Sequence, residues 1–127
     1  MSDVVLDASV LLAVLLQEPE SEKIAVLLDR ARMSSVNLAE VVTKLIAYGQ
    51  SADAVLTLID DMEIQVEPLD KSRAMATGLL TAKTSKAGLS LGDRACLSLA
   101  AELGLQAFTS DKAWAKVDAG ADVVVIR

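Results

Sequence analysis

Four acidic side chains occupy positions from which they could share one metal ion: Asp7, Glu40, Asp93 and Asp111. The local sequence places each of them where a strand ends or where a helix begins. Carboxylate oxygens are the ligands that hard ions such as Mg²⁺ and Mn²⁺ prefer. Four such groups could therefore hold an ion that activates water for the hydrolysis of a phosphate ester.

Each of these acids also has a purely structural explanation. Two of them follow a possible cap residue by three positions, Asn37 and Ser90, which fits a capping box at the start of a helix. Asp7 and Asp111 could likewise cap the helices that follow them. Capping accounts for each acid alone, but it does not explain why all four are expected at the same edge of the fold.

Alternating apolar runs and amphipathic stretches predict the elements that position these acids. The predicted strands are Val4–Leu6, Met33–Val36, Ile64–Leu69, Gln106–Thr109 and Val123–Ile126. The predicted helices are Ser9–Leu16, Ser21–Arg32, Asn37–Tyr48, Ser51–Met62, Lys71–Thr84, Leu91–Leu103 and Lys112–Val117, with a loop over Lys83–Gly88. This alternation indicates an α/β fold with a parallel sheet and right-handed crossovers.

A parallel sheet brings the four acids to one edge. Asp7 ends the first strand, Asp111 follows the fourth, and Glu40 and Asp93 fall in the first turns of their helices. Open α/β sheets bind ligands beyond the carboxyl ends of their strands. The acids are therefore expected to face a common ligand site.

The composition sets the class of protein. The 127 residues suit a single domain spanning 1–127, and the 53% apolar but only 2% aromatic content suits helices packed on a buried sheet. So much apolar surface predicts an oligomer or a dedicated partner, with the helices Ser21–Arg32 and Ser51–Met62 as candidate contact surfaces. The sequence lacks a basic leader or a membrane-length apolar stretch, and its single cysteine, Cys96, favours a reducing cytoplasm.

The charge distribution bears on whether the partner is a nucleic acid. The net charge of −6 argues against one, because proteins that bind phosphate usually carry a basic surface. However, the first 70 residues hold 13 acidic and 4 basic side chains, whereas the rest hold 5 and 8. Arg94, Lys112 and Lys116 lie near the acids and could contact phosphate or simply aid solubility. Trp114 could stack on a base, but it is expected to pack its helix against the sheet.

The residues that are missing narrow the chemistry. The sequence contains no histidine, which excludes a histidine-based ribonuclease and any Ser-His-Asp or Cys-His site. No Gly-x-x-x-x-Gly-Lys-Ser/Thr stretch is present, so a P-loop is not expected. A metal-dependent hydrolase is the chemistry that the residues still allow.

Four segments resemble, in order, the motifs of PIN domains, and most closely those of VapC-type ribonucleases, the toxins of toxin–antitoxin pairs. The segments span most of the chain: Val4–Leu11, Asn37–Val41, Leu91–Leu97 and Thr109–Trp114. The resemblance implies a three-layer sandwich around a central parallel sheet of about five strands. It also implies Mg²⁺ or Mn²⁺ held by the four acids, with Ser9 and Ser110 as supporting residues.

The same resemblance implies an endoribonuclease that acts as a toxin on RNA, forms a homodimer and is covered by a VapB-like antitoxin. Two other classes stay open on the residues alone. One is a Mg²⁺-binding phosphatase-like or receiver domain, although Ser9 stands where a dehalogenase-like phosphatase would place a second Asp. The other is a non-catalytic interaction module, which four intact acids argue against.

Overall fold

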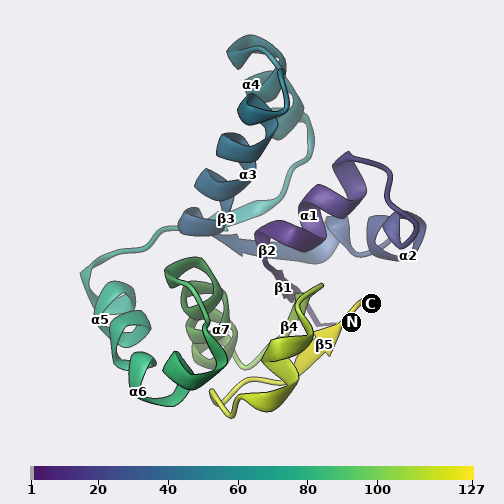
Figure 1. The fold of residues 1–127 in the computed structure, drawn as a ribbon. Helices are drawn as coiled ribbons and strands as arrows, with labels where there is room; N and C mark the ends of the chain where they lie inside the picture. The colour runs from purple at the N-terminus through teal and green to yellow at the C-terminus, as the bar shows by residue number, and fades with distance from the viewer. Residues whose placement is uncertain (1) are drawn as a thin grey trace.

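Five short parallel strands form the centre of the molecule, in the order β3-β2-β1-β4-β5. The computed structural model describes residues 2–127. The strands are β1 (Val4–Leu6), β2 (Ala31–Ser34), β3 (Gln65–Glu67), β4 (Gln106–Thr109) and β5 (Val123–Val125). The predicted α/β class with a central parallel sheet is confirmed (Figure 1).

Helices cover both faces of this sheet. The α-helices are α1 (Ala8–Leu15), α2 (Ser21–Ala25), α3 (Ser35–Ala47), α4 (Ala52–Asp61), α5 (Lys71–Leu79), α6 (Thr81–Thr84) and α7 (Leu91–Leu103). The 3-10 helices are η1 (Leu28–Arg30), η2 (Ser85–Ala87) and η3 (Lys112–Lys116).

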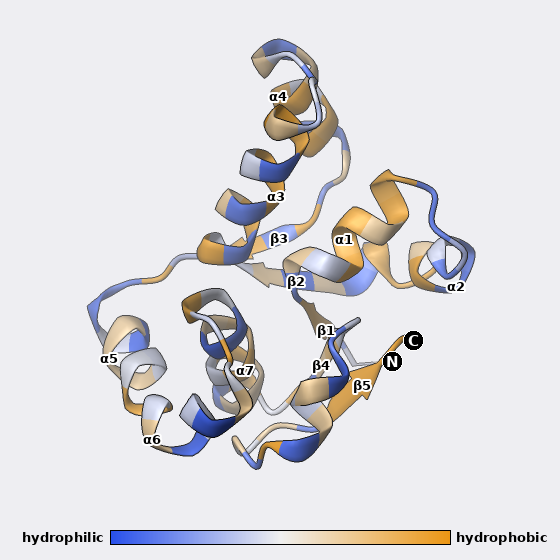
Figure 2. Ribbon diagram, viewed as in Figure 1, coloured by the Kyte–Doolittle hydropathy of each residue, from blue (hydrophilic) through white to orange (hydrophobic). Residues whose placement is uncertain are grey.

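Strand β1 shows how the layers are built, because successive side chains of a strand point to opposite faces. Val4 and Leu6 join a core with residues of α1 and α3, while Val5 joins a second core with α7 and Trp114. Both faces of the strand are therefore buried, which explains its unbroken apolar run. In Figure 2 helix α1 and strand β5 are coloured mainly hydrophobic. The expected packing role of Trp114 is confirmed, since the side chain is 0% exposed.

Two predicted boundaries near β2 were wrong. The helix expected over Ser21–Arg32 ends at Ala25, and η1 leads into β2 at Ala31, which pairs with Val4. The Ser34 hydroxyl accepts a 3.3 Å hydrogen bond from the Val36 amide, so the strand ends and α3 begins there. The strand expected over Met33–Val36 therefore lies two residues earlier.

The helix predicted over Lys71–Thr84 is interrupted. Helix α5 ends at Leu79 and α6 starts at Thr81, whose hydroxyl donates a 2.8 Å hydrogen bond to the Gly78 carbonyl. Side chains that bond nearby carbonyls in this way compete with regular helix. Part of the loop expected over Lys83–Gly88 forms η2.

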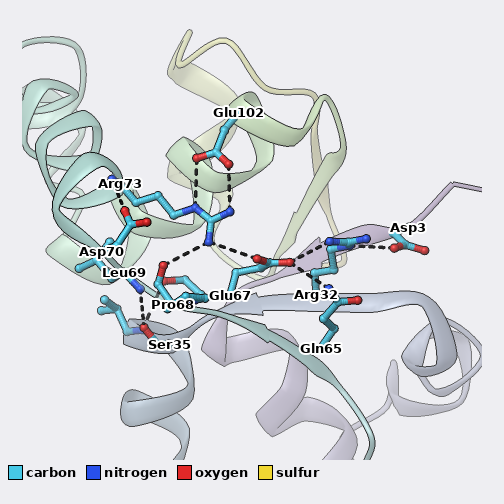
Figure 3. A network of polar contacts seen from close by, with 12 residues as sticks. Asp3, Arg32, Ser35, Gln65, Glu67, Pro68, Leu69, Asp70, Arg73 and Glu102 are labelled. Atoms are coloured by element: carbon cyan, nitrogen blue, oxygen red, sulfur yellow. Dashed lines mark hydrogen bonds and ion pairs between the residues drawn. The ribbon is translucent and has the colours of Figure 1, made fainter.

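A chain of ion pairs ties the sheet to the helices on its second face (Figure 3). Glu67, at the end of β3, accepts from Arg32 (2.8 Å) and from Arg73 (3.1 Å). Arg32 also contacts Asp3, and Arg73 contacts Glu102 on α7.

Within residues 2–127 no helix has both the length and the apolar character needed to cross a membrane.

Candidate active site

The four acids predicted from the sequence line one cavity of about 300 Å³. Asp7 caps α1 directly after β1, and Asp111 caps η3 just after β4. Asp93 lies in the first turn of α7. Glu40 lies in the second turn of α3, one turn later than predicted, because Ser34 rather than Asn37 caps that helix. The strand order brings all four to the carboxyl edge of the sheet.

Asp7 is the most enclosed of the four, with 5% of its surface exposed. Ser9 donates a 2.6 Å hydrogen bond to its Oδ1, and Thr109 donates a 2.6 Å hydrogen bond to its Oδ2. The Val10 amide also bonds Oδ1 at 3.0 Å. Burial nevertheless raises the pKa of Asp7 to about 6, because loss of hydration outweighs these donors and the charge of Asp93 adds to the effect.

The same two hydroxyls hold the loop after β4. Ser9 Oγ accepts a 3.1 Å hydrogen bond from the Ser110 amide, and Thr109 Oγ1 accepts a 3.0 Å bond from the Asp111 amide. Sequence reasoning singled out Ser9 and Ser110 but missed Thr109. Phe108 pairs with Leu6 in the sheet, so Thr109 falls opposite Asp7, and the strand register is the signal that could have revealed it.

Glu40 is held against the start of α7. The Asn37 side-chain amide donates to Glu40 Oε1 (2.9 Å) and to the Gly92 carbonyl (3.0 Å), and Asn37 is 1% exposed. A Cβ atom at Gly92 would overlap the Glu40 carboxylate. Asn37 therefore does not cap a helix, as the sequence suggested, but joins Glu40 to the residue beside Asp93.

The capping explanation holds for the other acids. Asp93 forms the predicted capping box: its Oδ2 accepts from the Ser90 amide at 2.8 Å, and its own amide donates to Ser90 Oγ at 3.2 Å. Asp111 Oδ1 accepts from the Ala113 amide at 2.9 Å. For Asp7, Asp93 and Asp111, a hydrogen bond at the start of a helix and a place at the shared cavity thus occur together, whereas Glu40 lines the cavity without capping a helix.

Cys96 lies in α7, three residues after Asp93, and is fully buried. Burial raises the pKa of its thiol well above the ordinary value, and the charges of Asp7, Asp93 and Glu40 raise it further. That three carboxylates act on one thiol shows how closely their negative charge is gathered.

The side chains as they stand do not form a finished ligand shell. Among residues 2–127, no three histidine, cysteine, aspartate or glutamate side chains are placed to hold one metal ion. The capping hydrogen bonds above turn several carboxylate oxygens toward backbone amides instead. The donor set nonetheless fits a hard divalent cation, since four carboxylates line one cavity and one of them, Asp7, is buried there.

The three predicted phosphate contacts, Arg94, Lys112 and Lys116, are not part of the cavity lining. The Arg94 guanidinium donates to the Thr77 carbonyl at 3.3 Å and to Thr81 Oγ1 at 2.9 Å, toward α5 and α6. Lys44 and Arg127, in contrast, do line the cavity. Neither of these two was found from the sequence.

The chain belongs to the PIN domain family, whose family model matches residues 4–120. No curated protein sequence matches it significantly.

Solved structures of other proteins share this fold over nearly the whole length of the chain. The DNA-bound VapBC complex of Salmonella typhimurium contains a chain 18% identical, with a TM-score of 0.74 and full coverage of both chains. VapBC-5 of Mycobacterium tuberculosis, from a toxin–antitoxin family, gives 25% identity and a TM-score of 0.65, covering 100% and 99% of the two chains. VapC20 of the same organism, described as a sarcin–ricin loop cleaving toxin, gives 16% and 0.70, covering 92% and 98%.

Proposed function

We propose that this PIN domain protein is a divalent-metal-dependent endoribonuclease that acts as the toxin of a toxin–antitoxin pair. The observation that carries the proposal is the gathering of Asp7, Glu40, Asp93 and Asp111 around one cavity at the ligand edge of the sheet. The similarity to VapC toxins supports RNA as the substrate. The absence of histidine from the sequence favours metal over histidine acid–base chemistry.

In this proposal Asp7, Glu40 and Asp93 hold Mg²⁺ or Mn²⁺. When bound, such an ion supplies a water of lowered pKa and offsets charge on the scissile phosphate. Ser9 and Thr109 orient the Asp7 carboxylate, and Asn37 orients that of Glu40. Asp111, the most exposed of the four acids, either contributes to ion binding or accepts a proton from the attacking water.

The partners follow from the same likeness and from the surface. The VapBC neighbours belong to toxin–antitoxin systems, which supports a protein antitoxin as partner. The proposal also includes a homodimer that acts in the cytoplasm. Large apolar side chains also stand exposed on or directly after several helices: Val26 (72%) follows α2, Leu56 (58%) lies on α4, and Met75 (60%) and Leu79 (79%) lie on α5. Such side chains favour contact with other chains.

The test of activity is incubation of the purified protein with RNA in Mg²⁺ or Mn²⁺, in chelator, and as the Asp7→Asn and Asp93→Asn variants. We expect cleavage only with metal, and a loss of at least about 100-fold in each variant. Asp60→Asn is the matched control, because Asp60 is exposed on α4 and does not line the cavity. Cleavage that persists in both site variants would contradict the proposed site.

The toxin role has a separate readout. Expression of the chain in bacterial cells should arrest growth, and Asp93→Asn should relieve the arrest at equal protein levels. A small neighbouring gene whose product binds the chain and restores growth would identify the antitoxin. If cells expressing the chain grow normally although the protein cleaves RNA in vitro, the nuclease assignment stands and the toxin role is contradicted.

A further inference from the structure

Helix α3 and its C-cap residue carry three different side chains that all line the cavity: Glu40 and Lys44 in the helix and Tyr48 at the cap, hereafter the α3 stripe. They follow one another at intervals of four residues, so they share one face of the helix. One residue is an acid of the candidate site, the next is a cation and the last is an aromatic. This order places a phosphate-binding group and a stacking surface on a path that begins at the acids.

The helix directs the stripe away from the sheet. Helix α3 begins at the carboxyl end of β2 and rises from the sheet toward α4 (Figure 1). At a rise of about 1.5 Å per residue, Lys44 stands about 6 Å and Tyr48 about 12 Å along the helix axis from Glu40. The stripe thus extends over a distance that suits a polymer rather than a small substrate.

Of the two cations that line the cavity, Lys44 is the one without an ion-pair partner among the described residues. Among residues 2–127 its ammonium takes part in no ion pair, although it is exposed beside the acids. Arg127, the other cation lining the cavity, is bound by Glu18 and by Glu20. Lys44 is therefore the positive charge that can neutralise a phosphate at this site.

Tyr48 is the aromatic side chain that can offer its face to a base. The chain holds three aromatics; Trp114 is fully buried and Phe108 packs in the core, whereas Tyr48 is 60% exposed. No hydrogen bond to another residue in the described part of the chain holds its hydroxyl. Exposed aromatics beside a positive charge are the elements that bind unpaired nucleotides.

We infer that the α3 stripe is the track on which a single RNA strand lies as it leaves the acids. Lys44 contacts a backbone phosphate, and Tyr48 stacks on an unpaired base. The substrate class is then single-stranded or looped RNA, because a base within a duplex has no free face to offer. This inference rests on the proposed ribonuclease function and adds the part of the protein that holds the substrate.

The test measures RNA affinity apart from cleavage, by fluorescence anisotropy with a short fluorescein-labelled single-stranded RNA of mixed sequence. All proteins carry Asp93→Asn so that the probe stays intact. Tyr48→Ala should weaken binding at least about five-fold, whereas Tyr48→Phe, which keeps the aromatic ring, should retain most of the affinity. Lys44→Gln should weaken binding and reduce the slope of log affinity against log salt by about 1, whereas Lys44→Arg should retain both.

Matched controls separate the stripe from general surface effects. Lys86→Gln removes an exposed lysine and Leu56→Ala an exposed apolar side chain, both outside the cavity, and neither should change affinity by more than about two-fold. Binding of a fully paired RNA should be insensitive to Tyr48→Ala.

The outcomes distinguish the inference from the function on which it rests. If the Asp93→Asn protein binds single-stranded RNA as tightly as its Tyr48→Ala and Lys44→Gln derivatives do, the α3 stripe does not hold the RNA strand. This holds even if the wild type cleaves RNA through its acids. Absence of any RNA binding by the Asp93→Asn protein also overturns the track. If cleavage itself is absent while the stripe variants weaken binding as expected, the track stands and the nuclease assignment falls.

Discussion

The Thr109 hydroxyl donates a 2.6 Å hydrogen bond to Asp7 Oδ2, joining two residues that are 102 positions apart in the sequence. Thr109 ends β4 and Asp7 follows β1, so the contact joins the central strand and its neighbour at their carboxyl ends. Both side chains are buried, at 0% and 5% exposure. The most enclosed acid of the site is thereby fixed by the register of the sheet.

Replacing Thr109 by valine tests this contact. Thr109→Val keeps the shape of the side chain but removes a donor to Asp7 and an acceptor for the Asp111 amide. We expect a loss of about 1–3 kcal/mol in the free energy of unfolding, and a pKa of Asp7 higher than about 6. Urea denaturation and NMR titration of the carboxyl carbon measure the two effects. Thr43→Val, on the exposed side of α3, is the control, and a Thr109→Val protein that matches it would show that the contact is unimportant.

The raised pKa of Asp7 predicts how stability depends on pH in the presence of chelator. The folded protein binds this proton more tightly than the unfolded chain, whose pKa is near 3.8. The stabilisation that the protonated Asp7 gives to the folded state is therefore complete below the pKa of the unfolded chain, and it is lost as the pH rises through about 6. A shift of this size amounts to about 3 kcal/mol.

Urea denaturation of the wild type and of Asp7→Asn measures this dependence. The difference between their free energies of unfolding should change by up to about 3 kcal/mol from about pH 4 to about pH 7, in the direction that favours the wild type at low pH. Mn²⁺ should reduce the change, because a cation beside Asp7 favours its ionised form. Parallel curves for the two proteins in chelator would argue against a buried, titrating Asp7.

Gly92 is predicted to matter for the site rather than for stability. In Gly92→Ala the added Cβ overlaps the Glu40 carboxylate, which can swing aside because it ends a flexible side chain. We expect RNA cleavage to fall at least about ten-fold, while the free energy of unfolding changes by less than about 1 kcal/mol. Gly78→Ala is the matched control, since Gly78 lies in α5 with open space around it. Equal cleavage by the two variants would mean that the position of Glu40 is unimportant.

The ion pairs around Glu67 should affect stability and leave the chemistry unchanged. Glu67→Gln keeps hydrogen bonding but removes the charge between Arg32 and Arg73 (Figure 3). We expect a loss of about 1 kcal/mol, reduced at high salt because these side chains are partly exposed. Thermal denaturation at two salt concentrations measures it, and Glu22→Gln on α2 is the control. A Glu67→Gln protein that is as stable as the wild type but cleaves RNA more slowly would contradict this prediction.

The sequence predicted best those elements whose ends are set by nearby residues. Ser90 and Gly104 bound α7, and both boundaries of that helix were predicted correctly. Strand β4 was also predicted with the right limits. The helix expected over Ser21–Arg32 failed because its apolar spacing also suits η1 followed by a strand, and pairing with β1 decides between them.

The site shows a similar division. The edge at which the four acids meet follows from strand alternation alone, so it could be read from the sequence. The contact between Asn37 and Gly92 joins residues 55 positions apart, and the facing of Lys44 and Tyr48 depends on how α3 packs. Such features require the relative placement of helices, which local patterns do not encode.

The central claim, that these acids hold a divalent ion, is tested most directly by calorimetric titration of Mn²⁺ into the purified protein. We predict that the wild type binds Mn²⁺, that Asp7→Asn and Asp93→Asn each weaken binding at least about ten-fold, and that Asp60→Asn does not. Mn²⁺ affinity that is equal in all four proteins, or absent from the wild type, would contradict the account.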